Sequence, residues 1–233
     1  MNEAIYNYDD LLNMLDSLLR EPTEFWDDFY SDRTKPIPFF ANKPDENLDS
    51  YFQKGLLNSG KALEFGCGPG RNAIYLVQNG FSVDAVDLSK ESLAWASERS
   101  KELNLDINFI KSNIFNLEIE ENSYELVYDS GCFHHIAPHR RMQYIELVMA
   151  ALKPGGHFAI TCFEEGGKYG GSDISDWEVY RRRNLQGGLG FTEEKLRQIF
   201  KDFEEIEIRK MNDVEDENNL FGTSAFWACL FRK

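Results

Sequence analysis

The stretch that most restricts the fold of this chain is residues 61–72, which read Lys-Ala-Leu-Glu-Phe-Gly-Cys-Gly-Pro-Gly-Arg-Asn. A short apolar run leads into three glycines, Gly66, Gly68 and Gly70, and a helical pattern follows directly. A glycine-rich turn between a strand and a helix lets a ligand approach the bare backbone, and it directs the N–H groups of the helix N-terminus at that ligand. The stretch therefore predicts a strand–turn–helix unit with a ligand site at the turn.

The next expected strand, residues 82–86, leads into Asp87. An acid in this place, about 20 residues after the glycine turn, can accept hydrogen bonds from both hydroxyls of a ribose. The glycines lack the Gly-x-Gly-x-x-Gly spacing of dinucleotide sites, because Arg71 occupies the third position of that fingerprint. Glu64 would repel a pyrophosphate but suits a cofactor that carries an ammonium and a sulfonium. The pattern predicts half of a nucleoside-cofactor site and disfavours a dinucleotide.

Three segments resemble the successive motifs of the class I S-adenosylmethionine (SAM)-dependent methyltransferases. They are Leu-Glu-Phe-Gly-Cys-Gly-Pro-Gly at 63–70, Val-Asp-Leu-Ser at 86–89 and Leu-Lys-Pro-Gly-Gly at 152–156, in order and at fitting intervals. The resemblance covers roughly residues 55–210. It implies SAM as cofactor, S-adenosylhomocysteine as product and transfer of a methyl group. The run at 128–141 most resembles the thiopurine methyltransferase-like and tellurite-resistance-like small-molecule branch.

Strand and helix signals alternate from the glycine turn to the C-terminus, without a repeat or a low-complexity linker. The expected strands are residues 61–65, 82–86, 107–110, 124–128, 157–163, 206–210 and 225–231. This rhythm predicts an α/β fold: a Rossmann-like, doubly wound, mostly parallel sheet with helices on both faces and a ligand at the carboxyl ends of the strands. The resemblance implies a seven-stranded sheet with an antiparallel last strand inserted beside the fifth. Residues 55–233 are therefore assigned to a SAM-binding methyltransferase domain.

Residues 1–54 are expected to form an N-terminal helical and aromatic flap. Leucines at helical spacing begin it, a further helix is expected at 45–57, and aromatic residues and prolines fill the segment between them. One interpretation places this flap against the side of the domain. The other makes it a lid in which Trp26, Tyr30 or Arg33 touches the cofactor or the substrate.

Residues 164–190 are a second candidate for a lid. The segment is rich in glycine and charge, and glycine pairs lie on both sides of Trp177 and Tyr180. A loop of this length in a compact domain is usually functional or disordered. Flexible ends around a rigid aromatic centre would suit a lid that closes the substrate pocket and excludes water. The alternative is a surface insertion without a role in binding.

The resemblance also implies which residues contact the cofactor: Glu64, Gly66, Gly68, Gly70, Arg71, Asp87, Leu88, Asn113, Ile114 and Asp129. Asn113 departs from the family, whose members commonly place an acid near here to meet the amino group of the adenine. Its amide can accept a hydrogen bond from that group or donate one to a ring nitrogen. An ordinary turn asparagine is the alternative interpretation.

Three of the four histidines fall within residues 134–139, after the fourth expected strand. A metal site would need ligands from elsewhere, since consecutive histidines on one element point apart, and no metal is predicted. His135 is expected to be a packing residue, and Cys132 a small wall residue rather than a nucleophile. Asp129 and His134 are the catalytic candidates, for orienting the methyl acceptor or removing its proton.

Acidic residues outnumber basic ones by 40 to 25, which gives a net charge of −15. Nucleic acids and anionic membranes reward a basic surface, so the expected partner is a small molecule, with no nucleic acid and no membrane. No apolar run approaches the roughly 18 residues of a membrane span. The N-terminus is acidic, unlike a signal peptide, and the four cysteines are scattered. These features predict a cytoplasmic protein with reduced thiols and leave its oligomeric state open.

The expected reaction is transfer of a methyl group from SAM to a sulfur, oxygen or nitrogen atom of a small molecule by in-line displacement. A base is needed only for a hydroxyl or a protonated nitrogen, since a thiol near its pKa reacts as the thiolate. Two alternatives stay open: a non-catalytic SAM-binding or regulatory module, and a nicotinamide-dependent oxidoreductase on the related fold.

Overall fold

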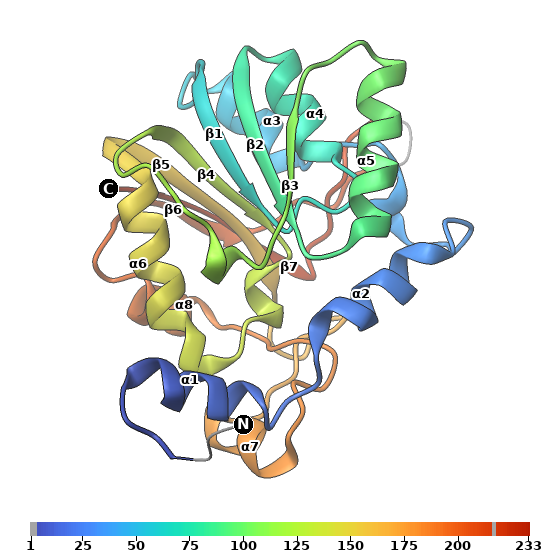
Figure 1. The fold of residues 1–233 in the computed structure, drawn as a ribbon. Helices are drawn as coiled ribbons and strands as arrows, with labels where there is room; N and C mark the ends of the chain where they lie inside the picture. Colours follow the sequence, from blue (N-terminus) through green and yellow to red (C-terminus); the bar gives the residue numbers. More distant parts are fainter. Residues whose placement is uncertain (1–3, 216–217) are drawn as a thin grey trace.

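The computed structural model of the protein describes residues 4–215 and 218–233. Its centre is a seven-stranded sheet in the order β3-β2-β1-β4-β5-β7-β6 (Figure 1). The strands are β1 (Gly60–Phe65), β2 (Phe81–Asp87), β3 (Asn108–Lys111), β4 (Tyr124–Ser130), β5 (Leu152–Phe163), β6 (Glu204–Lys210) and β7 (Phe226–Arg232). β7 pairs antiparallel with both of its neighbours, and the other neighbouring strands pair in parallel. The fold expected from the sequence is confirmed, including the last strand inserted beside the fifth.

β5 begins earlier than the sequence predicts. Residues 152–156 read as the stop of a helix, but Leu152 already pairs with Tyr124 on β4. The register then shifts before Leu126 pairs with His157. The Lys-Pro-Gly-Gly run is therefore the irregular beginning of a strand.

Helices cover both faces of the sheet. The α-helices are α1 (Tyr8–Asp16), α2 (Pro22–Ser31), α3 (Glu46–Gln53), α4 (Arg71–Gln78), α5 (Lys90–Glu102), α6 (Arg141–Ala151), α7 (Asp176–Arg182) and α8 (Glu193–Ile199). Short 3-10 helices are η1 (Pro38–Phe40), η2 (Ile114–Asn116), η3 (Phe133–His135) and η4 (Pro138–Arg140). No helix in the described part of the chain is both long enough and apolar enough to cross a membrane.

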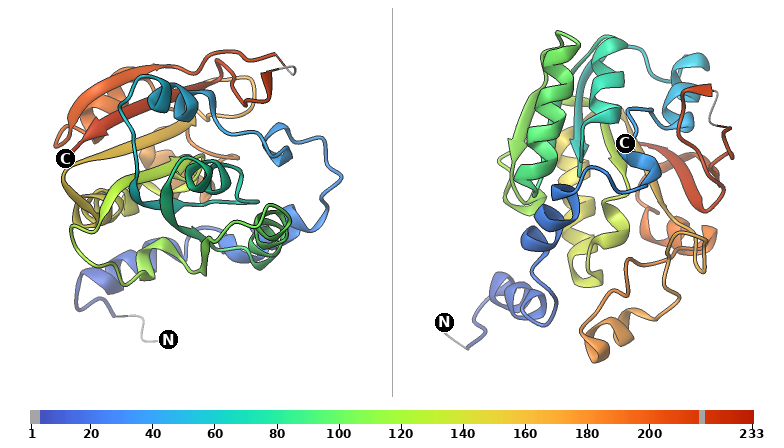
Figure 2. Two further views of the ribbon diagram at one scale, coloured as in Figure 1. Left: turned by 90° about the horizontal axis from the view of Figure 1, so that it is seen from above. Right: turned by 90° about the vertical axis from the view of Figure 1, so that its right-hand side faces the viewer.

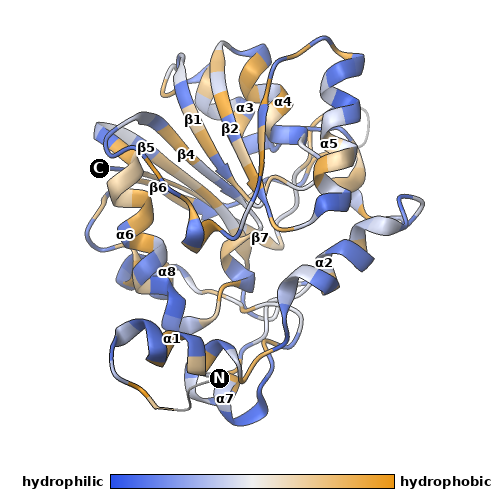
Figure 3. Ribbon diagram, viewed as in Figure 1, coloured by the Kyte–Doolittle hydropathy of each residue, from blue (hydrophilic) through white to orange (hydrophobic). Residues whose placement is uncertain are grey.

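Two apolar clusters lie on opposite faces of the sheet, because alternate residues of a strand point to opposite sides. One cluster joins the strands to α6 and α8 and includes Phe65, Val127, Tyr144, Phe158, Ile160, Leu196 and Phe200. The other joins them to α3 and α4 and includes Leu48, Tyr51, Ala62, Ala73, Leu76, Leu126 and Leu230. Figure 3 shows the apolar colours gathered on the strands and on the helix sides that face them. The sheet is thus covered on both faces, and only its ends are open for a ligand.

The N-terminal segment divides into two parts. In the side views of Figure 1 and Figure 2, α1, α2 and α7 lie beyond the carboxyl ends of the central strands. α3 differs, since its Leu48 and Tyr51 are completely buried in the core beside α4. The expected flap of residues 1–54 therefore includes a helix that belongs to the core, and the part before α3 covers the edge of the sheet.

Candidate active site

The glycine loop follows β1 and leads into α4. Gly66, Gly68 and Gly70 have φ angles of +62°, +52° and +78°, a left-handed conformation that costs other residues free energy. Space is also limited, because a Cβ at Gly66 would lie 2.7 Å from the Cβ of Cys132. A Cβ at Gly70 would lie 3.0 Å from the Cβ of Ala96 on α5. The loop therefore needs glycine both for its conformation and for its contacts with the loop after β4 and with α5.

Asp87, at the end of β2, joins the first two loops at the carboxyl edge. Its side chain is buried, and its Oδ2 accepts a hydrogen bond from the N–H of Gly68 at 2.8 Å. Its Oδ1 accepts one from the N–H of Ser89, also at 2.8 Å. Burial raises the pKa of Asp87, and these two backbone donors oppose that rise. Each carboxylate oxygen has a second lone pair, so Asp87 can still accept from the hydroxyls of a ribose.

A buried cluster of charges lies behind the glycine loop. Arg71 forms an ion pair with Asp45 at 2.6 Å, and it donates to the Ser130 hydroxyl at 2.8 Å and to the Lys43 carbonyl at 3.0 Å. Glu64 is 1% exposed, and its Oε2 has no hydrogen-bond partner among the described residues. With Asp87, the cluster contains three carboxylates, Asp45, Glu64 and Asp87, and one guanidinium, so potential negative charges outnumber positive ones.

The excess of buried carboxylates indicates whether a positively charged cofactor such as SAM fits the site. Burial raises the pKa of Glu64 well above its ordinary value, Arg71 opposes the rise, and the other nearby carboxylates add to it. A buried carboxylate without a partner is costly unless a cation or a proton neutralises it. The ammonium and sulfonium of SAM would supply that positive charge, so the site fits this cofactor. Glu64, the glycine loop and Asp87 are the residues that would hold it.

The adenine end of the expected site contains Asn113 and Ile114. Oδ1 of Asn113 accepts a hydrogen bond from the N–H of Phe115 at 3.1 Å and caps η2. This oxygen therefore acts as that of an ordinary turn asparagine, the alternative interpretation of this residue. Its amide nitrogen can still donate to a ring nitrogen. Ile114 is buried and Leu88 is half-buried. Their contacts with an adenine stay predictions.

Asp129 organises the turn after β4. The carboxylate is completely buried, and burial raises its pKa to about 6. Its Oδ1 accepts from the N–H groups of Cys132 and Phe133, at 2.8 and 3.3 Å, and its Oδ2 accepts from the Tyr144 hydroxyl at 2.7 Å. These bonds hold the loop that carries His134. A direct contact of Asp129 with a methyl acceptor stays a prediction, since the structure shows this carboxylate in a positioning role.

Of the two histidines of η3, His134 is buried and His135 is half-buried. The ring of His134 stacks on Phe163 with centroids 3.7 Å apart, and its Nδ1 accepts from the N–H of Phe163 at 3.3 Å. This bond leaves the ring proton on Nε2. Burial lowers the pKa of His134 well below its ordinary value and that of His135 to about 4. Neither ring carries a positive charge near neutral pH. Because the Nδ1 lone pair of His134 is taken by the N–H of Phe163, its Nε2–H is left to donate a hydrogen bond, which favours orientation of an acceptor over removal of its proton.

α2 lies directly over the glycine loop. Tyr30 is 8% exposed, and a Cβ at Gly68 would lie 3.0 Å from its hydroxyl oxygen. Burial raises the pKa of Tyr30 well above its ordinary value, with Asp87 as the largest charge contribution. Trp26, one turn earlier, meets His135 edge-on with centroids 4.8 Å apart. The flap therefore reaches the site with two of its three expected residues.

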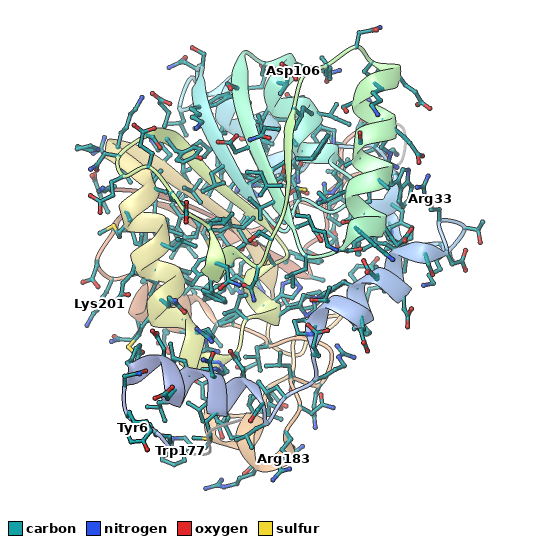
Figure 4. All side chains as sticks on the ribbon, viewed as in Figure 1. Tyr6, Arg33, Asp106, Trp177, Arg183 and Lys201 are labelled. Carbon is teal, nitrogen blue, oxygen red and sulfur yellow. The ribbon has the colours of Figure 1, made fainter. Side chains whose placement is uncertain are left out.

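The third expected flap residue, Arg33, lies away from the glycine loop. Its guanidinium pairs with Glu98 on α5 and lies over the Trp95 ring at 5.2 Å (Figure 4). Sequence reasoning missed Asp27, whose Oδ1 accepts from the Ser89 hydroxyl and from the N–H of Lys90. The signal that could have indicated Asp27 is its spacing, one helical turn before Tyr30 on the same face.

The segment 164–190 takes a position that differs from the expectation. Trp177 is 76% exposed and points to solvent (Figure 4). The hydroxyl of Tyr180 accepts from the N–H of His139 at 2.9 Å and lies 2.8 Å from its Nδ1. Neither aromatic residue faces the glycine loop in this structure. A Cβ at Gly171 would lie 1.9 Å from the Glu164 carbonyl oxygen, so this expected hinge glycine is closely packed.

Two adjoining cavities of about 530 and 390 Å³ lie beside the carboxyl end of β5. Both are lined by Tyr169, Val214, Gly222 and Thr223. The first is also lined by Glu164 and residues 166–168, and the second by residues of the flap between Pro36 and Lys43. Because they lie beside residues that directly follow the carboxyl end of β5 and beside the flap, they are candidates for the approach of an acceptor.

Residues 62–156 match the model of a family described as a methyltransferase domain. The matched segment runs from β1 into β5 and includes the glycine loop, Asp87 and the turn at Asp129. The chain carries a methyltransferase domain and is similar to SAM-dependent methyltransferases. The family, the enzyme class and the cofactor expected from the sequence are confirmed, and the nicotinamide-dependent alternative is wrong.

The methyltransferase is 27% identical over 134 residues to an uncharacterized methyltransferase of Schizosaccharomyces pombe, a match that covers 56% of this chain and 90% of the relative. It is 27% identical over 176 residues to the probable SAM-dependent methyltransferase TehB of Haemophilus influenzae, covering 74% of this chain and 57% of TehB. A solved structure of the 1,6-didemethyltoxoflavin N1-methyltransferase of Burkholderia thailandensis superposes with a TM-score of 0.65 and 19% identity. It covers 100% of this chain and 93% of that chain, and at this identity the likeness concerns the fold.

Proposed function

We propose that the methyltransferase transfers a methyl group from SAM to a sulfur, oxygen or nitrogen atom of a small molecule by in-line displacement. The observation that carries this proposal is the position of α2, whose Trp26 and Tyr30 cover the carboxyl edge of the sheet above the glycine loop. A site that is covered by aromatic side chains of the same chain suits an acceptor that is small enough to be enclosed. The didemethyltoxoflavin methyltransferase, with its small bound heterocycle, supports the same class of acceptor.

The residues of the chain contribute mainly by positioning and by excluding water. When bound, SAM supplies an activated methyl group on a sulfonium. Asp87 would orient its ribose, and Glu64 would meet its ammonium. On the acceptor side, the Nε2–H of His134 would orient the nucleophile by donating a hydrogen bond to it. His135 and Trp26 would form a wall.

We further propose that residues 164–190 act as a lid over the acceptor. α7 is held at η4 by Tyr180, so closure would begin with release of the bonds to His139. The exposed Trp177 is the side chain that such a movement would bring to the acceptor. Trp177→Ala should raise the Michaelis constant for the acceptor or lower turnover while leaving SAM affinity unchanged, and amides 170–185 should exchange more slowly with product and acceptor bound. Loss of SAM affinity in this variant would instead place the segment at the cofactor.

The experiment that tests the proposed function is a screen of a small-molecule library with labelled SAM, read out as S-adenosylhomocysteine. A thiol, hydroxyl or amine acceptor should show turnover with the wild-type protein and none with Gly68→Val, whose side chain would fill the space beneath Tyr30. Gly55→Ala is the matched control, because Gly55 also has a positive φ but nothing within 4 Å of a Cβ. Tight SAM binding without turnover of any acceptor would favour the non-catalytic module.

A further inference from the structure

α2 is attached to the cofactor loops by a carboxylate that the family motifs do not contain. Oδ1 of Asp27 accepts a hydrogen bond from the Ser89 hydroxyl at 2.8 Å and another from the N–H of Lys90 at 2.9 Å. Lys90 is the first residue of α5, so Asp27 occupies the N-terminus of that helix, where N–H groups lack partners within the helix. The carboxylate therefore makes two directional bonds from the flap to the loop after β2.

The charge state of Asp27 agrees with this geometry. Burial alone would raise the pKa of Asp27, but hydrogen bonds from Ser89 and from the N–H groups of Glu91 and Lys90 lower it below its ordinary value. The group is ionised near neutral pH, and its bonds are of the stronger, charge-assisted kind.

The bonds of Asp27 continue to the glycine loop. Ser89, which donates its hydroxyl to Asp27, donates its backbone N–H to Oδ1 of Asp87. Oδ2 of Asp87 accepts from the N–H of Gly68, and the Tyr30 hydroxyl lies against Gly68. Because Asp27 and Tyr30 are one turn apart on α2, the contacts form a closed circuit through both cofactor loops and back to the same helix face.

The other attachments of α2 near the site are less directional. Arg33, two residues beyond the end of α2, makes two hydrogen bonds to Glu98, but both side chains are substantially exposed, and an exposed pair contributes little. Trp26 meets His135 through an aromatic contact that tolerates sliding. Asp27 is thus the attachment that determines where Tyr30 lies along the glycine loop.

We propose that Asp27 is a positioning residue of methyl transfer: it holds α2 on the N-terminus of α5, so that Tyr30 closes the cofactor site at Gly68. Entry and exit of the cofactor then require the bonds of Asp27 to open. The inference rests on the proposed function, because it places the cofactor at the glycine loop. The group acts through Tyr30 and touches neither the cofactor nor the acceptor.

The test measures release of S-adenosylhomocysteine from the full-length protein by stopped flow, together with kcat and KM for an acceptor from the screen. In Asp27→Ala the product should leave about tenfold faster, the size expected when charge-assisted bonds are lost. kcat should fall wherever chemistry limits turnover, with a smaller change in the acceptor KM. Asp27→Asn retains an accepting oxygen and should restore most of the slow release. Asp28→Ala, an exposed acid on the same helix, is the matched control and should leave release unchanged.

A double-variant cycle separates positioning from a general loss of stability. In a Tyr30→Ala background, Asp27→Ala should add nothing to the release rate, because the side chain that it positions is absent. Additive effects, or an unchanged release rate in folded Asp27→Ala and Asp27→Asn, would overturn the inference. The proposed function would fail in a different way: the wild-type protein itself would bind SAM without transferring its methyl group to any acceptor.

Discussion

At the scale of single residues, the site is built from buried acids with contrasting surroundings. Asp87 is buried but receives two backbone N–H groups, whereas Glu64 is buried with one oxygen unpartnered. Asp129 is buried and accepts hydrogen bonds from two backbone N–H groups of its own turn and from the hydroxyl of Tyr144. The three carboxylates therefore have different roles. Asp87 joins two loops and keeps free lone pairs, and Glu64 lacks a partner that a cation could supply. Asp129 holds the turn that carries His134.

Asp87→Ala should weaken SAM binding about ten- to a hundredfold, because it removes charge-assisted contacts to the ribose and loosens the N–H of Gly68. Isothermal titration calorimetry measures the change. Asp84→Asn is the matched control, since Asp84 lies on the same strand but is bonded to Asn108 and Tyr124. SAM affinity that is unchanged in a folded Asp87→Ala protein would remove Asp87 from the cofactor site.

Glu64 should make the stability of the cofactor-free protein fall as pH rises. Its pKa in the folded protein is raised above the ordinary value of 4.5, so the folded state holds a proton that the unfolded state has lost. The penalty is absent below about pH 4.5 and grows as pH rises toward the folded pKa. Thermal unfolding at pH 5 and pH 8 should show Glu64→Gln close to wild type at pH 5 and more stable than wild type at pH 8. A stability difference between Glu64→Gln and wild type that stays constant with pH would contradict a raised pKa of Glu64 in the folded protein.

Cofactor binding supplies the complementary measurement on Glu64. SAM brings positive charge, so its stabilisation of the wild-type protein should increase from pH 5 to pH 8. Glu64→Gln should remove most of this pH dependence. Adenosine, which lacks the ammonium that Glu64 would meet, serves as the control ligand and should show the smaller dependence.

At the scale of elements, two segments far apart in sequence cover the same edge of the sheet. α2 is attached to α5 through Asp27, and α7 is attached to η4 through Tyr180 and His139. His139 also lies 2.8 Å from Asp16 at the end of α1, so the N-terminal helices and the insertion meet at one histidine. The segment 164–190 is closely packed on both sides of α7: Gly171, before the helix, lies against Glu164, and Gly188, after it, lies against Phe163.

Gly171→Ala should destabilise the fold by about 2–4 kcal/mol, because Gly171 has a φ of +93° and a Cβ there would lie 1.9 Å from the Glu164 carbonyl oxygen. Gly166→Ala, with a φ of +69° but nothing within 4 Å of its Cβ, should cost only about 1 kcal/mol. Urea unfolding of the two variants measures both values. An equal loss of free energy of unfolding in the two variants would show that the backbone around Gly171 can shift to accommodate a Cβ, so that the segment is less rigid than its contacts indicate.

At the scale of the whole molecule, acidic residues outnumber basic ones, and the arginines that could form a basic surface are mostly paired with acids. The candidate basic track contains Arg140, Arg141 and residues 181–183. Arg140 pairs with Asp16, Arg141 with Asp176, and Arg181 and Arg182 with Glu178. These acids partly neutralise the track, and they reduce the counterion release that drives binding to nucleic acid.

Purified cellular RNA and DNA should therefore take up no label when incubated with the protein and labelled SAM. Liquid scintillation counting of the recovered nucleic acid measures this, with an acceptor from the small-molecule screen as the positive control under the same conditions. Label on either nucleic acid at the rate seen with the small molecule would contradict the proposed acceptor class.

The local sequence by itself determined the elements and the cofactor half-site. A glycine loop needs residues that tolerate positive φ, and an acid at the end of β2 needs only the strand that carries it, so both are visible along a few adjacent positions. The alternation of strand and helix signals likewise predicted the mostly parallel sheet, whereas the place of the last strand came from the resemblance to the class I family. α2 and α7 were harder to identify, because short helices rich in aromatic or charged residues owe their stability to tertiary contacts rather than to propensity.

Only the tertiary structure decided which of the candidate residues meet. Tyr30 and Trp26 reach the site, while Arg33 and Trp177 do not, although the sequence made all four candidates for a lid. Asp27 gained its role from Ser89 and Lys90, more than 60 positions away along the chain. Such pairings depend on how whole elements dock, and docking is determined by contacts across long sequence separations that no local pattern records.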